Sequence, residues 1–130
     1  MKANERVIAV LVAVLVSLVC VIGCAQAAGA APLVYSVPVK GGIEHGVAAF
    51  LARGLREARE AGADAVIIEI DTPGGFVDAA LKMRDSIMTA GVPTVAFVNT
   101  RAWSAGALIA IACEDVGMKM GGSMGAAETR

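Results

Sequence analysis

The sequence predicts an α/β domain in which helices cover a parallel sheet. Three observations lead to this fold class. Short apolar runs rich in β-branched residues alternate with amphipathic segments, glycines mark most of the boundaries, and the strand–helix order recurs three times between residues 34 and 113. Repeated strand–helix–strand units form parallel sheets with right-handed crossovers. At 130 residues the chain has room for one such domain at most.

The first unit consists of a strand expected over 34–39 and a helix expected over 47–61. Apolar residues recur at three-to-four spacing on one face of this helix, and charged residues occupy the opposite face. The apolar face contains Val47, Leu51, Leu55 and Ala58, and the charged face contains Arg53, Arg56, Glu57 and Glu60. Gly62 is expected to end the helix.

The second and third units repeat the pattern. An almost continuously apolar strand over 65–70, typical of the centre of a parallel sheet, precedes a helix over 78–89. On that helix, one row is formed by Leu81, Arg84 and Met88, with Ala80 and Ile87 beside it. A strand over 94–98 then precedes a helix over 104–113, whose small apolar residues predict burial on most sides.

The N-terminal region, residues 1–27, is similar to a secretory signal peptide. A charged start is followed by an apolar run over 7–22, shorter than the roughly 20 apolar residues that span a bilayer comfortably. Small residues before the cut favour cleavage after Ala27, with residues 28–33 as a linker. An uncleaved anchor and a lipoprotein signal with lipidated Cys24 are the alternatives. The sequence therefore predicts an exported domain.

Composition excludes several classes of function. A formal net charge of -1 and 4% aromatic residues leave no basic stripe or stacking platform for nucleic acid. After cleavage the only cysteine is Cys113, which has no intramolecular disulfide partner. Cysteine and histidine residues with the spacing of metal ligands are lacking, so neither a metal nor another cofactor is expected.

Two motifs carry the predicted chemistry. Asp71–Gly75 follows the 65–70 strand and Arg101–Gly106 follows the 94–98 strand, so both should lie at the carboxyl edge of the sheet. Ser104 begins a helix, where free N–H groups and the helix dipole stabilise an oxyanion. Gly74 and Gly75 lack Cβ atoms, so their backbone can face a ligand closely. Taken singly, each motif is also compatible with a plain N-cap or a turn.

The base that a serine nucleophile needs is not evident. His45, the single histidine, precedes the first expected helix and is interpreted as a surface or capping residue. Lys119 is the single lysine after Ser104 and is interpreted as a solvated edge residue. Asp71 is expected to shape its turn. The general base is therefore unknown from the residues themselves.

These motifs resemble the protease domain of the long-form NfeD family, the stomatin operon partner proteins, which are membrane-associated serine proteases of the ClpP/crotonase superfamily. The similarity runs from residue 34 to residue 127 and includes Met124–Ala127, which resembles the family's Ile-Gly-Ala-Ala. The resemblance implies a ClpP/crotonase-like fold of repeated β-α-β units, with 34–130 as an N-terminal part that is incomplete at its C-terminus.

The resemblance also implies roles. Ser104 becomes the nucleophile, the N–H groups of Gly74, Gly75 and Ala105 form the oxyanion hole, and the base is a lysine beyond Arg130. The implied protein is an extracytoplasmic, membrane-associated endopeptidase of the cell envelope. Its implied partners are apolar polypeptide substrates, a stomatin-like membrane protein and further copies of itself. Residues 1–130 alone are expected to be inactive. Two alternatives stay open: a non-catalytic envelope assembly module, and a crotonase-like acyl-CoA enzyme, against which the export signal argues.

Overall fold

The computed structural model describes residues 8, 11–14 and 31–126. The chain divides into two compact units, residues 1–31 and residues 32–130. In the first unit residues 11–14 are helical, and most of the expected signal peptide and linker, including Cys24 and Ala27, lies outside the described residues. In the described part of the chain, no helix has the length and apolar character needed to cross a membrane.

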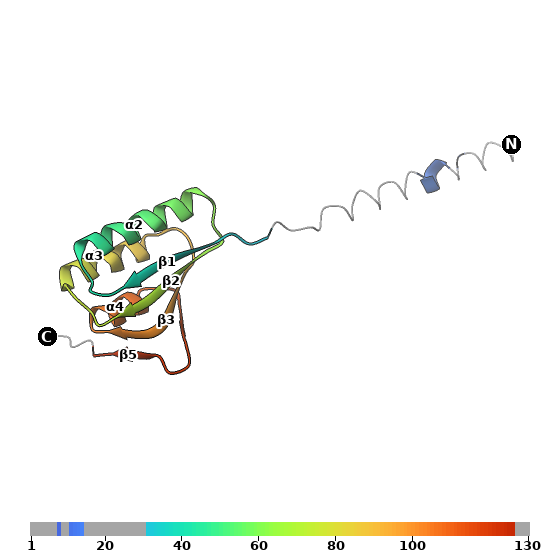
Figure 1. The fold of residues 1–130 in the computed structure, drawn as a ribbon. Coiled ribbons are helices and arrows are strands. Elements are labelled where there is room, and N and C mark those ends of the chain that lie inside the picture. Colours follow the sequence, from blue (N-terminus) through green and yellow to red (C-terminus); the bar gives the residue numbers. More distant parts are fainter. Residues whose placement is uncertain (1–7, 9–10, 15–30, 127–130) are drawn as a thin grey trace. The chain divides into compact units, whose positions relative to one another are not determined.

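The second unit alternates strands and helices in the predicted order (Figure 1). Its elements are β1 (Val34–Lys40), α2 (His45–Glu60), β2 (Ala65–Thr72), α3 (Val77–Met88), β3 (Thr94–Trp103), α4 (Ala105–Ile111), β4 (Asp115–Met118) and β5 (Ser123–Gly125). All paired strands are parallel, in the order β1-β2-β3-β4, and β5 pairs with the end of β3. The predicted α/β class with a parallel sheet is confirmed.

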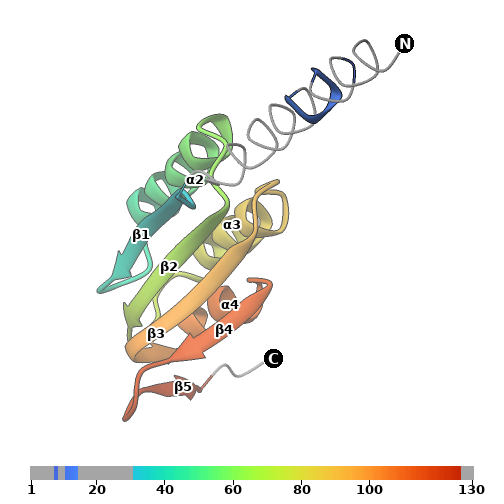
Figure 2. The ribbon, with the colours of Figure 1, turned by 90° about the vertical axis from the view of Figure 1, so that its right-hand side faces the viewer.

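The helices form one layer behind the strands (Figure 2). Along β2 the side chains alternate between fully buried and half-buried, with Val66, Ile68 and Ile70 on the buried face. This period of two is the strand's own geometry, so one face of the sheet meets the helices and the other does not. The core accordingly lies between the sheet and the helical layer.

Helix α2 buries the face that its sequence predicts. Leu51, Leu55 and Ala58 are buried together with Ala48, while Val47 is half-buried. The four charged residues predicted to face water are exposed. The three-to-four spacing therefore identified the packing face of this helix correctly.

Helix α3 packs through a different row from the one its large residues suggest. Leu81 is 37% exposed and Met88 is 70% exposed. The buried side chains are Ala79, Ala80, Met83 and Ile87. Alanines let the helix approach the sheet closely, and Met83 fills the remaining space, because its unbranched side chain adapts to irregular gaps. Side-chain size did not reveal which row is buried, because both rows have helical spacing.

Two strands extend beyond their predicted ends. β2 continues to Thr72 and β3 continues to Trp103, and Thr72 pairs with Ala102 after a shift in register. The polar residues between 99 and 101 masked this continuation in the sequence. The short strand β5 was not predicted at all, and Lys119, interpreted from the sequence as a solvated edge residue, directly follows β4. These extensions carry both motifs into the sheet.

Cys113 ends the α4 region as a buried free thiol. The pKa of Cys113 is raised from 9.0 to about 11, mainly by burial; a hydrogen bond with Thr94 opposes this shift, and the nearby Glu114 charge makes a smaller contribution to it. Since the thiolate is the reactive form, we expect Cys113 to resist alkylation near neutral pH in the folded protein and to react fully in urea. Mass spectrometry of its peptide measures this. Equal modification in both states would contradict the assigned burial.

The same shift predicts a pH dependence of stability. The folded state holds the Cys113 proton more tightly than the unfolded state, so its contribution is fully present below pH 9.0 and is lost as the pH rises toward about 11. Denaturant unfolding of Cys113→Ala and the parent chain over this range should show the loss in the parent alone.

Candidate active site

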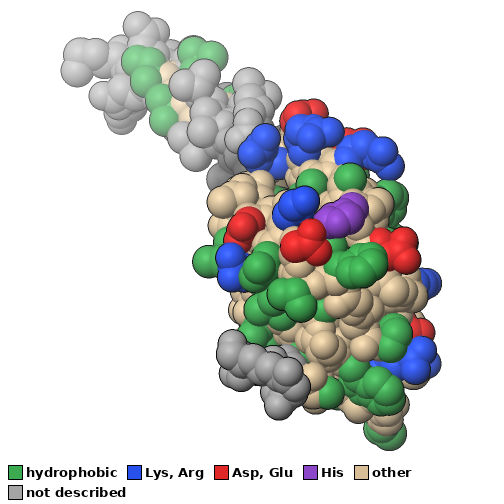
Figure 3. Space-filling model, turned by 90° about the vertical axis from the view of Figure 1, so that its left-hand side faces the viewer, with side chains coloured by type: hydrophobic (Ala, Val, Ile, Leu, Met, Phe, Trp, Pro, Cys, Tyr) green, Lys and Arg blue, Asp and Glu red, His purple; other side chains and the backbone are tan. Residues whose placement is uncertain are grey.

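The two motifs meet at the carboxyl edge of the sheet. β2 and β3 are neighbours, and the 71–75 and 101–106 segments lie where these strands end. Figure 3 views the molecule from the side toward which the strand arrows of Figure 1 point. The predicted placement of both motifs at a common edge is therefore what the fold produces.

Ser104 occupies a strained corner between β3 and α4. Its φ of 51° and ψ of -117° lie in a region that glycine normally fills at the first central position of a type II′ turn. Its N–H donates to the Gly125 carbonyl at 2.8 Å, and its carbonyl accepts from Ala107 at 3.0 Å. The side chain makes no capping hydrogen bond and is exposed. A plain N-cap, the structural alternative for this serine, is thus not what the geometry shows.

Gly74 packs directly against Ser104. Its φ is +109°, and a Cβ atom added there would lie 2.9 Å from the Ser104 Cβ and 3.4 Å from the Ala105 nitrogen. Covalent bonds of about 1.5 Å then put the Gly74 nitrogen within about 6 Å of the Ser104 Cβ. The glycine turn and the serine are immediate neighbours, and only glycine leaves room between them.

Gly75 packs against the β1–α2 loop on its other side. A Cβ atom there would lie 2.5 Å from the Ile43 nitrogen and 2.8 Å from its carbonyl carbon. Ile43 donates to the Gly74 carbonyl at 2.9 Å, and Phe76 donates to the Ile43 carbonyl at 2.9 Å. Because N–H directions alternate along an extended backbone, the Gly75 N–H points away from this loop.

Thr72 organises the backbone around the turn. It is fully buried, its hydroxyl donates to the Gly41 carbonyl, and the same oxygen accepts the Gly74 N–H at 3.0 Å. The Gly74 N–H is therefore already used. The sequence analysis included this threonine only as part of a motif. Nothing in the sequence indicated that Thr72, Ile43 and Gly125 would form the hydrogen bonds that hold the backbone of the site.

The free donors at this edge include the N–H groups of Gly75 and Ala105. Within the described residues neither forms a hydrogen bond. Ala105 is the first residue of α4, whose first N–H groups have no partner inside the helix. Two preorganised backbone donors beside an exposed hydroxyl are the arrangement that stabilises the oxyanion of acyl transfer.

The candidate bases lie as the sequence interpretation expects, on the surface. The Nε2 atom of His45 is 3.3 Å from an Asp78 carboxylate oxygen, and its side chain is 58% exposed. Lys119 is exposed beyond β4. In the described part of the chain, no side chain hydrogen-bonds to the Ser104 hydroxyl, and no cluster of acidic, histidine or cysteine side chains suits a metal.

Asp71 contacts the β1–α2 loop through its backbone and Arg101 through its side chain. Its carbonyl accepts the Gly41 N–H at 3.0 Å, and its Oδ1 lies 3.7 Å from the Arg101 Nε. The Arg101 guanidinium lies 5.4 Å from the centre of the Trp103 ring. The Trp103 indole in turn donates to the Ser123 hydroxyl at 2.9 Å. These contacts fasten β5 to the end of β3, next to Ser104.

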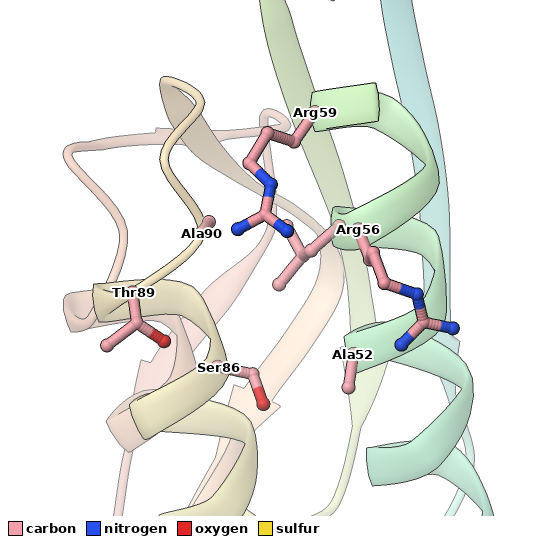
Figure 4. Close-up of a pocket in the computed structure, with 7 residues that line it drawn as sticks. Ala52, Arg56, Arg59, Ser86, Thr89 and Ala90 are labelled. Atoms are coloured by element: carbon pink, nitrogen blue, oxygen red, sulfur yellow. The ribbon is translucent and has the colours of Figure 1, made fainter. Parts of the chain in front are cut away.

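A separate cavity of about 160 Å³ lies between α2 and α3 (Figure 4). Its lining is formed by Ala52, Leu55, Arg56, Arg59, Ser86, Thr89 and Ala90. The Ser86 and Thr89 hydroxyls donate to carbonyls of their own helix, so their protons are not offered to the cavity. None of its lining residues belongs to either motif, and it is distinct from the candidate active site.

Known proteins similar to the chain include two membrane proteins. The chain is 48% identical over 94 residues to membrane protein NfeD1b of Bacillus subtilis, which covers 72% of this chain and 22% of that protein. It is 33% identical over 116 residues to the membrane-bound protease PH1510 of Pyrococcus horikoshii, covering 87% of this chain and 26% of that protein. The chain thus spans about a quarter of the length of these curated relatives.

Solved structures show the same architecture. A serine-to-alanine mutant of the 1510-N membrane-bound stomatin-specific protease has a TM-score of 0.74 and 32% identity, over 77% of this chain and 50% of that chain. A lysine-to-alanine mutant of that protease in complex with a substrate peptide has a TM-score of 0.73 and 33% identity, over 77% and 47% of the two chains. A ClpP1 mutant from Listeria monocytogenes has a TM-score of 0.59 and 25% identity, over 61% and 46%. The ClpP-like fold is confirmed.

A family model assigns the chain directly. The model for the NfeD1b N-terminal domain matches residues 33–130, which includes every strand of the sheet and both motifs. Its relatives include proteases. The chain therefore belongs to the NfeD1b N-terminal domain family, a ClpP-like family related to membrane-bound proteases.

Proposed function

We propose that this domain forms the nucleophile and oxyanion half of a serine protease site. Ser104 is the nucleophile, and the N–H groups of Gly75 and Ala105 hold the oxyanion, with Gly74 providing the close approach. The observation that carries the proposal is the position of Ser104. Its exposed side chain makes no capping hydrogen bond, its φ is positive, and it packs against the Gly74–Gly75 turn. Backbone strain in a non-glycine residue is typical of functional sites, where the surrounding structure holds it in place.

The proposed reaction is acyl transfer. The Ser104 oxygen attacks the peptide carbonyl carbon, its proton passes to the base, and the carbonyl oxygen gains charge between the two backbone donors. The amine leaves with a proton, and water then hydrolyses the acyl-enzyme. The proposed base is a lysine beyond Arg130, as the family resemblance implies. The serine and lysine variants among the solved relatives support a serine–lysine pairing.

The proposed substrate is an apolar polypeptide segment close to a membrane. Exposed apolar side chains surround the carboxyl edge, among them Phe76 at 60%, Val77 at 68% and Trp103 at 41% exposure. A relative described as stomatin-specific supports a stomatin-like membrane protein as partner. Membrane association of the mature protein and assembly into homo-oligomers belong to the same proposal.

Peptide hydrolysis tests the proposed function. We compare the full-length protein that contains this domain, its Ser104→Ala variant, and residues 1–130 alone. We expect cleavage by the full-length protein, loss of cleavage in Ser104→Ala, and no cleavage by residues 1–130, because a neutral hydroxyl without a base is a poor nucleophile. Serine-dependent cleavage by residues 1–130 would show that the base lies among them, and Lys119→Ala would then locate it.

The proposed location is the extracytoplasmic face of the cell envelope, reached through the 1–27 signal. If this is correct, the mature protein begins near Ala28, because Ala25 and Ala27 are the small residues that a signal peptidase reads. N-terminal sequencing of protein recovered from the cell envelope measures the start. A lipid-modified Cys24 at the terminus would favour the lipoprotein alternative instead, and an intact Met1 would favour the anchor.

A further inference from the structure

We infer that His45 is a positioning residue for the turn of residues 73–76, which carries the Gly75 N–H, and that it acts with Asp78 and Phe76. The sequence offered this histidine only as a surface or capping residue. Its effect on catalysis rests on the proposed function, whereas its effect on the turn does not. The inference concerns how the Gly75 N–H is kept in its direction.

The turn has no rigid element of its own. Residues 73–76 connect β2 to α3, and their backbone is fixed from outside by the β1–α2 loop. The fixing contacts are the Ile43 N–H to the Gly74 carbonyl and the Phe76 N–H to the Ile43 carbonyl, both 2.9 Å. These two bonds bracket Gly75, so any movement of the β1–α2 loop relative to the turn rotates the Gly75 N–H.

His45 bridges the two segments where each enters its helix. It is the first residue of α2, two positions after Ile43, and Asp78 lies in the first turn of α3, two positions after Phe76. Its Nε2 lies 3.3 Å from the Asp78 Oδ2, and its ring stacks on Phe76 with a centroid distance of 6.1 Å and an interplanar angle of 12°. One side chain thus contacts the last residue of the 73–76 connection and the second residue of α3.

The contacts also explain why His45 is a poor candidate for the base. Its Nε2 faces Asp78, and its ring face is against Phe76. Figure 3 shows the single histidine on the surface at the carboxyl edge, next to acidic side chains. Its position instead suits a side chain that holds the N-terminal ends of α2 and α3 together.

Amide hydrogen exchange, measured on the 130-residue chain, tests the inference. In His45→Ala, we expect exchange of the Ile43 and Phe76 N–H groups to rise about two- to fivefold, the range expected for loss of an exposed polar side-chain contact and a stacked ring. Exchange in the middle of α2, at Leu51 and Leu55, should not change. His45→Phe keeps an aromatic ring and should restore part of the protection.

The matched control is Arg53→Ala. Arg53 forms a comparable exposed pair with Glu57 at 3.7 Å on the same helix, away from the turn. It should leave Ile43 and Phe76 exchange at the parent rate. Equal exchange at these two amides in His45→Ala and Arg53→Ala would overturn the inference, and so would an increase spread evenly along α2.

A second measurement, of kcat and KM, tests the effect of His45 on catalysis, which depends on the proposed function. In the full-length protein, His45→Ala should lower kcat about two- to fivefold with KM unchanged, because oxyanion donors act in the transition state. A change in KM alone would contradict the positioning role. If the parent protein shows no Ser104-dependent cleavage, the proposed function fails, and the exchange experiment still decides the role of His45.

Discussion

Ser104→Gly is expected to stabilise the domain while removing the proposed nucleophile. A serine at φ 51° and ψ -117° carries strain of about 1–3 kcal/mol. Glycine adopts these angles freely, although its greater freedom in the unfolded chain offsets about 0.5–1 kcal/mol of the gain. We therefore expect the free energy of unfolding to rise by about 1 kcal/mol, as measured by denaturant unfolding, together with complete loss of labelling by a covalent serine probe in the full-length protein.

Ser104→Ala is the matched control for that substitution. Alanine removes the hydroxyl, which makes no capping hydrogen bond, but keeps the Cβ atom and hence the strain. Its stability should stay within about 0.5 kcal/mol of the parent, as for other substitutions away from packed features. A Ser104→Gly variant no more stable than Ser104→Ala would show that the corner is not strained, and the strongest structural support for a functional serine would be lost.

Gly75→Ala is expected to destabilise the domain strongly. Its Cβ atom would fall 2.5 Å from the Ile43 nitrogen and 2.8 Å from the Ile43 carbonyl carbon, and backbone atoms cannot move aside as a side chain does. Overpacking of this kind costs about 3 kcal/mol. We expect a loss of that size in denaturant unfolding, and loss of Ser104-dependent cleavage in the full-length protein, because separating the turn from Ile43 redirects the Gly75 N–H.

Gly46→Ala provides the comparison. Gly46 lies in the first turn of α2, and a Cβ atom there would meet nothing within 4 Å. Alanine in a helix is favoured over glycine by up to about 1 kcal/mol, so this variant should match or exceed the parent in stability. If Gly75→Ala and Gly46→Ala unfold at the same denaturant concentration, the close packing of the turn on Ile43 is not important for stability.

The sequence predicted the architecture because the signals for it are local. The β-branched run at 65–70 and the apolar face of 47–61 each fix one element by its own period, and repeated units fix a parallel sheet. β5 was missed because its three residues are too few to show an alternation and stand among glycines. The continuation of β3 was missed because Asn99 and Arg101 have little preference for strands. The structure of this stretch depends on the pairing of Ala102 with β2 and of residues 101–103 with β5.

The position of the candidate site was predictable from the sequence, but the hydrogen bonds that hold its backbone were not. Strand ends and glycines placed Ser104, Gly74 and Gly75 at one edge, and the resemblance gave them roles that remain predictions. What the sequence does not express is long-range hydrogen bonding. Thr72 captures the Gly74 N–H, and Ile43 brackets Gly75 from a loop 32 positions earlier in the chain. Such contacts depend on the assembled fold, so residue type and spacing do not reveal them.

The bond from the Ser104 N–H to the Gly125 carbonyl has a consequence for the order in which the domain is completed. A growing polypeptide leaves the ribosome from its N-terminus, so β1, β2 and the glycine turn are available long before Gly125. The corner at Ser104 gains its anchor only when the final described strand pairs with β3. A nascent chain that has not yet reached Gly125 thus lacks the contact that holds the Ser104 backbone, so this corner is anchored only after β1 to β4 have been synthesised.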